Sequence, residues 1–318
     1  MWSHLTRRPR SRPALTGAVL LAVALTAGLT GCMADDSGGG DGADTTGLDL
    51  PEGATMPFDL YLGQDVTYIL YAQRQVRARC MADAGFTQLL DTGDRLGENM
   101  FGDMSEPRYP PRTEEEARAN GFHGPVPGAP ASVLSFDAGF DQAYDACFAE
   151  AEEAVGASPG LIAGYVEQLG NTINRELWNE LEAVEAEYAD EVLDCLAGHG
   201  FEPDSREAYR EDPDPHERFG IPLGDYHPTA PEWEPDRTPG TVAVGPPDPD
   251  RTYQPTEEES RLAVAMVQCR TETGFFAEID EVNLTAQQDI VEDHAVEFAE
   301  LNPQIEQAAM RAAEVLDR

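Results

Sequence analysis

The chain of 318 residues is strongly acidic: 21 basic residues, all of them arginine, stand against 60 aspartates and glutamates, and the net charge at pH 7 is −39. Such a charge repels nucleic acid and anionic headgroups, so we do not expect a nucleic-acid-binding protein. The lack of lysine in the sequence excludes Schiff-base chemistry and the lysine of a phosphate-binding loop. Composition alone therefore excludes several classes of function.

Residues 1–32 have the features of an export signal. Arginines precede an apolar run from Ala18 to Leu29, which is too short to span a bilayer as a mature helix. The run ends in "LTGC" at residues 29–32, which resembles the lipobox of bacterial lipoproteins and implies a diacylglyceryl group on Cys32, with cleavage just before it. The alternative is an ordinary secretory signal in which Cys32 is incidental. We favour the general secretory route, and the twin-arginine route stays open.

Lipidation of Cys32 would hold the protein at the cell membrane, on its extracytoplasmic face. Two acyl chains, such as palmitate, give stable binding to a bilayer, whereas one chain gives only marginal binding. Residues 33–60 contain much glycine and aspartate and few large apolar side chains, a composition that cannot offset the entropy of ordering the chain. We therefore predict a flexible tether over residues 33–60 and a fold from residue 61.

Four cysteines remain beyond Cys32, and an even number in an exported chain predicts two disulfides. Each of them lies on an amphipathic helical pattern. Three pairings are open, and the simplest one stays within each half of the fold: Cys80 with Cys147, and Cys195 with Cys269. The alternative of free or metal-binding thiols lacks the close C-x-x-C spacing of a zinc site.

Three of these cysteines begin the same pattern of cysteine, four residues, glycine and phenylalanine: "CMADAGF" from Cys80, "CLAGHGF" from Cys195 and "CRTETGF" from Cys269. A glycine after the last helical turn can adopt the left-handed conformation, and the next residue then packs back on the helix. The pattern predicts structural helix stops at Gly85–Phe86 and Gly200–Phe201. In the third copy the apolar pattern continues past Gly274, so we expect only a kink there.

Helical periodicity predicts an all-α fold of two disulfide-closed helical repeats with long, proline-rich, irregular loops. The first repeat covers residues 61–157, and the second covers residues 158–318 with a C-terminal helical extension interrupted at Pro303; together they form one domain. Capping boxes, in which a threonine and a glutamate three residues later bond to the helix N-terminus, are expected at Thr113 and Thr256. "TVAVG" at 241–245 is the best candidate for a strand.

Residues 202–255 hold 12 of the 24 prolines and five aromatic side chains. Exposed aromatic rings suit a binding surface for an envelope protein or a glycan, but the same rings could instead cover the helical core. His216, Asp225 and His227 in this segment form a weak candidate for a metal or acid–base site, because their spacing matches no helical ligand pair. We expect no cofactor and no catalytic residue.

The lipobox, the Gly/Asp tether and the repeated C-x4-GF helix ends resemble those of actinobacterial lipoproteins with this cysteine pattern. The resemblance covers most of the mature chain and implies lipidation of Cys32 and disulfide bonds for the other four cysteines, but no activity, substrate or catalytic residue. We therefore expect a lipid-anchored, extracytoplasmic, non-catalytic binding or structural module of the cell envelope. The alternative is an envelope hydrolase or metal-dependent enzyme that uses the 202–255 loop. Whether the protein is an enzyme, and its oligomeric state, stay open.

Overall fold

A computed structural model describes residues 56–90, 92, 96–97, 111–211 and 213–317 of the chain. The predicted signal at residues 1–32, the lipidation site Cys32 and the tether up to residue 55 lie outside the described residues. Within them the fold is mostly helical and contains two disulfide bonds, as expected. The helices, including a 3-10 helix η1 and a π-helix η2, are η1 Pro57–Leu60, α1 Gly63–Asp83, α2 Glu114–Asn120, α3 Ala138–Val155, α4 Pro159–Ala163, η2 Gly164–Gly170, α5 Asn171–Gly198, α6 Arg206–Glu211, α7 Pro215–Phe219, α8 Glu257–Glu272, α9 Phe275–Asp293 and α10 Ala295–Leu316.

Two short antiparallel ladders make the all-α prediction too strict. Strand β1 (Val133–Ser135) pairs with β3 (Val242–Val244), and β3 lies in the segment that the sequence marked as the best strand candidate. Strand β2 (Asp225–His227) pairs with β4 (Thr252–Gln254) and was not predicted. These strands of three residues are too short to show an alternating apolar pattern, so their sequences give little signal. The fold is mostly helical with two small ladders.

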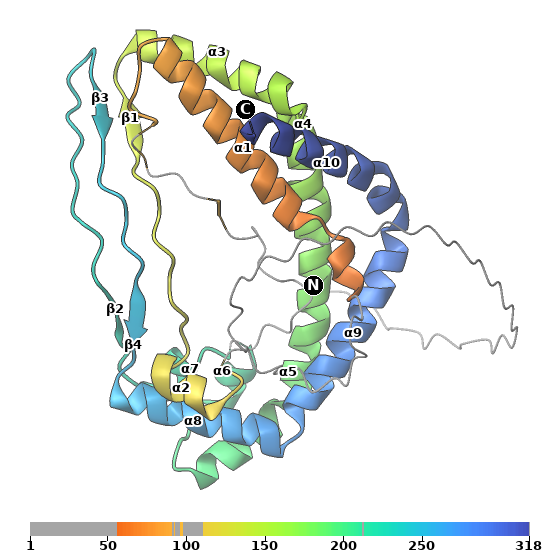
Figure 1. The fold of residues 1–318 in the computed structure, drawn as a ribbon. Coiled ribbons are helices and arrows are strands. Elements are labelled where there is room, and N and C mark those ends of the chain that lie inside the picture. The colour runs from red at the N-terminus through yellow and green to blue at the C-terminus, as the bar shows by residue number, and fades with distance from the viewer. Residues whose placement is uncertain (1–55, 91, 93–95, 98–110, 212, 318) are drawn as a thin grey trace, which may run out of the picture. The chain divides into compact units, whose positions relative to one another are not determined.

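The first disulfide joins α1 to α3. Cys80 and Cys147 are bonded with a Cα–Cα distance of 5.6 Å, and α10 packs against both helices. Figure 1 shows α1 and α3 beside each other, with the C-terminal end of α10 close to both. The large apolar core beneath includes Ile69 and Ala72 of α1 and Ile305 of α10, all fully buried. The packing and the covalent bond together fix the relative placement of α1 and α3.

The second disulfide joins α5 to α8, again with a Cα–Cα distance of 5.6 Å, between Cys195 and Cys269. The helix that carries Cys195 begins at Pro159 after the N-cap Ser158, whose hydroxyl accepts a bond from the Leu161 N–H. It continues through η2, which begins at Gly164 and ends at Gly170, into α5. A π-helical insertion of this kind is frequent at functional sites. Both cysteine pairs are those that the sequence analysis favoured.

Helices α1 and α5 end in the same way. Gly85 has φ +96°, the Phe86 N–H donates to the Met81 carbonyl over 2.8 Å, and the Gly85 N–H donates to the Ala82 carbonyl. The equivalent bonds run from Phe201 to Leu196 (2.9 Å) and from Gly200 to Ala197 (3.0 Å). These are the two bonds of a Schellman motif, in which the residue after the glycine closes over the last turn. Phe86 and Phe201 each pack on the small apolar cluster that contains the end of their helix.

Two expectations about the C-terminal helices were wrong. Gly274 is not a kink within one helix: it is left-handed (φ +81°) and separates α8 from α9, which begins at Phe275. Pro303 does not interrupt its helix either, because α10 runs through it. A proline inside a helix costs ~3 kcal/mol or more, and the burial of Ile305, Ala308 and Ala312 offsets this cost. The break lies instead at His294, whose ring bonds to Glu176 of α5 over 3.0 Å.

The folded part begins before the predicted tether boundary at residue 60. Residues 57–60 form η1, in which Phe58 is 2% exposed and its N–H donates to the Gln287 side chain of α9. The ring of Tyr61 then stacks on that of Tyr165, with centroids 4.9 Å apart. Two aromatic side chains close to the boundary supply the apolar surface that the Gly/Asp segment lacks.

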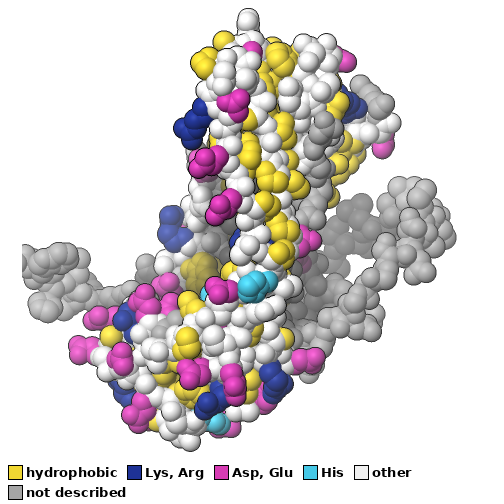
Figure 2. Space-filling model, turned by 90° about the vertical axis from the view of Figure 1, so that its left-hand side faces the viewer, with side chains coloured by type: hydrophobic (Ala, Val, Ile, Leu, Met, Phe, Trp, Pro, Cys, Tyr) yellow, Lys and Arg dark blue, Asp and Glu magenta, His cyan; other side chains and the backbone are white. Residues whose placement is uncertain are grey.

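Acidic side chains are unevenly spread over the described surface. Figure 2 shows the face that carries the strands. Aspartates and glutamates gather toward the bottom of the view. Hydrophobic side chains form a band in the upper part, where β1 and β3 lie. Leu134 and Val244 of these strands are 43% and 40% exposed. Among the described residues, no helix is long and apolar enough to cross a membrane. Two disulfides are typical of an extracytoplasmic protein.

Candidate functional site

The aromatic side chains of residues 202–255 are largely used for packing. Tyr209 and Tyr253 are 2% and 6% exposed, and Phe219 packs on the same apolar cluster as Tyr209. Trp233 lies so close to Gly245 that a side chain there would overlap its ring. These positions agree with the interpretation that the rings cover the helical core, and they leave little of this segment's aromatic surface for a partner.

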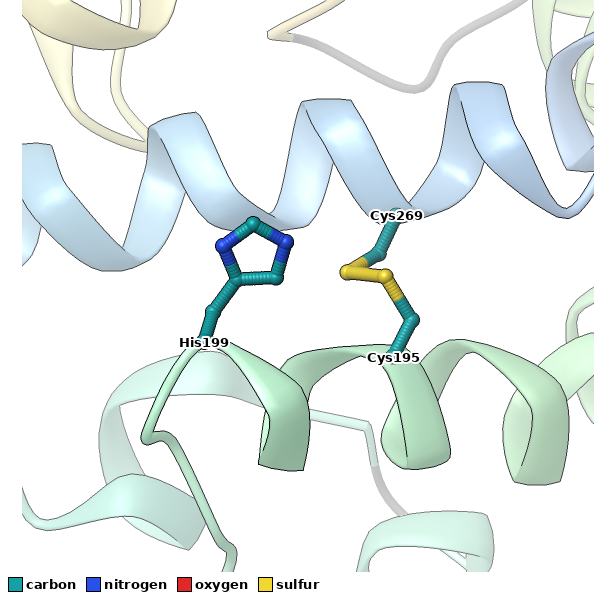
Figure 3. Close-up of side chains that lie close together, drawn as sticks. All are labelled: Cys195, His199 and Cys269. Carbon is teal, nitrogen blue, oxygen red and sulfur yellow. A yellow bond between two sulfur atoms is a disulfide. The ribbon is translucent and has the colours of Figure 1, made fainter.

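The weak metal candidates of this segment are not brought together with a third described ligand. Asp225 and His227 both lie on β2 with exposed side chains. His216 lies on α7, and its side chain is not among those that the structure describes. The one group of metal-ligand side chains among the described residues is Cys195, His199 and Cys269. Figure 3 shows that both sulfur atoms of this group form the disulfide, and a metal binds the thiolate rather than the disulfide. His199 is the C-cap of α5.

Glu259 has a structural role that differs from the expected capping box. Thr256 caps α8 by accepting from the Glu259 N–H, as predicted, but the Glu259 carboxylate is fully buried and bonds to other segments of the chain. It accepts bonds from the Tyr253 hydroxyl (2.9 Å), the Gly224 N–H (2.9 Å) and the Phe122 N–H (3.4 Å). Burial and the bond to Glu259 raise the pKa of Tyr253. This carboxylate therefore ties the segment after α2 and the residue before β2 to β4 and α8.

The strongest candidate for a ligand site is a cavity of about 520 Å³ beside α1, which we call the α1 cavity. Its walls come from three helical segments: α1, α3, and the continuous segment of α4 and η2. On α1 the lining positions recur at the three- and four-residue spacing of one helix face. The apolar lining residues are Leu70, Phe148, Pro159, Ile162, Ala163 and Val166, and the polar ones are Gln73, Arg74, Arg77, Glu152 and Glu167.

Arg77 is the central polar group of the α1 cavity. Its guanidinium carbon lies 4.8 Å from the ring centroid of Tyr144 and 5.5 Å from that of Phe148, so aromatic faces stabilise the cation. Its Nε is buried and has no hydrogen-bond partner among the described residues. The same holds for Oε1 of Glu152. A buried polar atom without a partner is costly, so each of these two atoms favours a ligand group that would satisfy it.

The first disulfide fixes the geometry of this site. Cys80 lies one turn beyond Arg77 on α1, and Cys147 directly precedes Phe148 on α3. Gln73, which is 9% exposed, donates from Nε2 to the Ala157 carbonyl over 2.8 Å and so ties α1 to the loop before α4. A covalent bond and a buried hydrogen bond therefore hold the three walls, as expected of a largely preformed site.

A second cavity, of about 400 Å³, lies on the other side of the same arginines. Arg74 and Arg77 line both cavities. The second one adds the hydroxyl groups of Thr92, Ser135 and Tyr144. The two arginines thus stand between a mainly apolar space and a more polar one.

Sequence reasoning did not find the α1 cavity. Its one local signal was the run "RQVRAR" at residues 74–79, which places three arginines on one helix of an otherwise acidic chain. That run does not reveal that Phe148 and Ile162, from other helices, complete the walls. The chain matches no protein-family model, no curated protein and no solved structure, so the site is interpreted from its own geometry.

Proposed function

We propose that this protein is a lipid-anchored, extracytoplasmic binding module of the cell envelope, related to the actinobacterial lipoproteins that it resembles, and that the α1 cavity is its ligand site. The observation that carries the proposal is the buried Nε of Arg77, which has no hydrogen-bond partner among the described residues and belongs to a side chain that lines a cavity of about 520 Å³. This volume is within the range of small-molecule sites. The lipobox at Cys32 and the two disulfides support the anchor and the compartment.

The lining of the α1 cavity supports binding rather than catalysis. Its residues supply apolar surface, two guanidinium groups, two carboxylates and an amide, which suit orientation and affinity. A nucleophile activated by a neighbouring base, the usual sign of covalent catalysis, is not found among its lining residues. The proposed role is therefore non-catalytic.

We also propose that residues 61–157 and 158–318 are two copies of one helical unit within a single domain. In each copy a disulfide joins a helix that ends in a Schellman motif to a second helix, α1 to α3 and α5 to α8. Such a duplication would explain why the C-x4-GF pattern recurs. The α1 cavity is then formed by both copies, because α1 and α3 belong to the first and α4 and η2 to the second.

The anchor is tested by labelling cells with radioactive palmitate and comparing the full chain with Cys32→Ala. We expect label in the unaltered protein only, together with release of the variant from the membrane fraction. Label in both chains, or in neither, would contradict lipidation of Cys32.

Binding is tested by native mass spectrometry of the full-length protein purified from membranes. We expect a non-covalent adduct that disappears in Ala163→Trp, which fills the α1 cavity without changing a charge, and that persists in Leu223→Trp, a matched control at an exposed position outside the cavity lining. An adduct that survives Ala163→Trp would place the ligand elsewhere. Stoichiometric zinc that is lost in His216→Ala with His227→Ala would instead favour the metal-dependent enzyme.

A further inference from the structure

We infer that the ligand of the α1 cavity is a single-chain anionic amphiphile: an acyl chain that carries a carboxylate or phosphate head. This inference rests on the proposed binding function and specifies the chemistry of the ligand. It is carried by three features of the cavity, namely its apolar walls, the arginines at their edge and the carboxylate beside them.

The walls match an acyl chain. Leu70, Ile162 and Val166 come from different turns of two helical segments, and Phe148 faces them from α3. A chain of methylene groups gains free energy in proportion to the apolar area that it removes from water, and it needs no hydrogen-bond partner along its length. The exposed fraction of Phe148, 38%, shows apolar surface that a chain in the cavity could cover.

The arginines match an anionic head. A guanidinium group binds a carboxylate or a phosphate through two parallel hydrogen bonds, and the Nε of Arg77 is one of the donors of that fork. Tyr144 and Phe148 hold the guanidinium by its face, which leaves its edge for hydrogen bonding. Arg74 adds a second cation to the same lining.

The net charge of the protein does not oppose this assignment strongly. Charges farther away than a Debye length, about 8 Å at physiological ionic strength, are largely screened when they are exposed. Most of the acidic side chains seen in Figure 2 gather at the end away from β1 and β3, whereas β1 residues line the second cavity next to Arg77. Within the lining of the α1 cavity, Arg74 and Arg77 balance the charges of Glu152 and Glu167, so the binding of an anionic head depends on direct hydrogen bonds to the guanidinium groups.

Glu152 further restricts which chemical groups the head of the ligand can contain. Its buried Oε1 has no partner among the described residues and can only accept a bond when ionised. A head that has a hydroxyl or amide donor next to its anion would satisfy both this oxygen and Arg77. Lysophosphatidylglycerol and N-acyl amino acids have such heads, whereas a simple fatty acid has the anion alone. The second cavity shares Arg74 and Arg77 with the α1 cavity, and its polar lining adds three hydroxyl groups and the Asp141 carboxylate.

The test uses the full chain in membranes and photoreactive diazirine probes, with labelled residues mapped by mass spectrometry. The probes are a diazirine palmitate and the matching diazirine fatty alcohol, which has the same chain and no charge. We expect the acid to label residues of the cavity wall, such as Leu70, Ile162 and Val166, and the alcohol to label them at least about tenfold less, because a charged hydrogen bond contributes on the order of 1.5–3 kcal/mol.

Variants of the protein separate the contribution of the ligand's acyl chain from that of its anionic head. Arg77→Met should reduce labelling by the acid to the level of the alcohol, whereas Arg79→Met, on the same helix but outside the cavity lining, should leave it unchanged. Ala163→Trp should abolish labelling of the wall by both probes. Competition by unlabelled lysophosphatidylglycerol, compared with N-palmitoylglycine, then tells a phosphate head from a carboxylate head.

The outcomes distinguish this inference from the proposed function. Equal labelling by acid and alcohol, unaffected by Arg77→Met, overturns the anionic head while a ligand site at the cavity stands. Wall residues that are labelled by neither probe, together with a native adduct that is lost in Ala163→Trp, overturn the amphiphile and leave another ligand class. Absence of both labelling and adduct overturns the inference and the proposed function together.

Discussion

The two disulfide-bonded helix pairs, α1 with α3 and α5 with α8, share a covalent framework. They differ in whether an arginine of the pair has a charged partner among the described residues. Each pair has the same Cα–Cα distance across its disulfide, 5.6 Å, and one helix of each pair ends in the same two backbone bonds. Each also has an arginine stacked on aromatic rings, Arg77 on Tyr144 and Phe148 in the first pair and Arg270 on Phe275 in the second.

In the α5–α8 pair the arginine has a protein partner. Arg270 lies 3.2 Å from Glu185, and the two side chains are 9% and 19% exposed. In the α1–α3 pair the Nε of Arg77 is buried and has no partner among the described residues, although Glu152 also lines the cavity. The same covalent framework therefore supports two arrangements of an arginine. Arg270 is paired with a carboxylate and stabilises the fold, whereas Arg77 lines a cavity that we assign to ligand binding.

The largest expected effect comes from removing each disulfide. Replacing both cysteines of a pair by alanine should lower the free energy of unfolding by roughly 4 kcal/mol for either pair, because each bond closes a loop of about 70 residues in the unfolded chain. Urea unfolding followed by circular dichroism measures this. Only Cys80→Ala with Cys147→Ala should also weaken labelling of the α1 cavity, and equal loss of labelling in both double variants would contradict the special role of the first pair.

The next effect tests how strongly the hydrogen bonds to the buried Glu259 carboxylate of α8 stabilise the fold around the second disulfide. Glu259→Ala leaves the Tyr253 hydroxyl and two backbone N–H groups without their acceptor, so we expect a loss of about 3 kcal/mol in unfolding free energy. The matched control is Glu258→Ala, an exposed glutamate in the same first turn of α8, which should change it by about 0.5 kcal/mol or less.

A glycine pair provides an independent check on Glu259. At Gly121 (φ +61°) an added Cβ would overlap the Glu259 carboxylate, whereas at Gly85 (φ +96°) it would meet nothing within 4 Å. Gly85→Ala should cost only the ~1–2 kcal/mol of the left-handed backbone. Gly121→Ala should cost more, because its ψ of −125° lies outside the left-handed helical region and because its Cβ would overlap the Glu259 carboxylate. Similar losses in the two variants would mean that the carboxylate can move aside, and the tight arrangement around Glu259 would be refuted.

These same residues show which parts of the structure were predictable. The helix ends at Gly85 and Gly200 follow from a local signal, a glycine after an amphipathic helix. The even set of cysteines in an exported chain predicts two disulfides but leaves three pairings open, and the simplest pairing, within each half of the fold, is the one formed. The caps at Thr113 and Thr256 are local too, and both threonines bond as expected.

The predictions that failed, and the site that was missed, concern features that depend on distant parts of the chain. The sequence around Glu259 is that of a capping box, but two of its partners, Phe122 and Gly224, lie 137 and 35 residues away. Pro303 would end an isolated helix, but tertiary packing holds α10 through it. The α1 cavity needs walls from α1, α3 and α4 at once, so no single segment shows it. Local patterns predict helix ends, whereas the site depends on how helices are placed against each other.

The smallest expected effect compares the two stacked arginines directly. Arg270→Met keeps the apolar stem but leaves the Glu185 carboxylate without its cation, and should lower the unfolding free energy by about 2 kcal/mol at pH 7. Arg77→Met loses mainly the stacking on aromatic rings, which contributes about 0.5–1 kcal/mol at exposed sites. Urea unfolding of both variants measures the difference, and equal losses would mean that Arg77 has a structural partner after all.

The pH dependence gives the comparison a second readout. Burial raises the pKa of Glu185 and Arg270 lowers it, with burial the larger influence; without Arg270 the pKa should rise further. A carboxyl group with a raised folded-state pKa stabilises the fold below its unfolded value, near 4.5, and this contribution is lost as the pH rises through the folded value. Arg270→Met should therefore recover stability relative to the unaltered protein between pH 7 and pH 4.5. Arg77→Met should not recover, because no carboxylate with a raised pKa depends on Arg77 for its charge partner among the described residues.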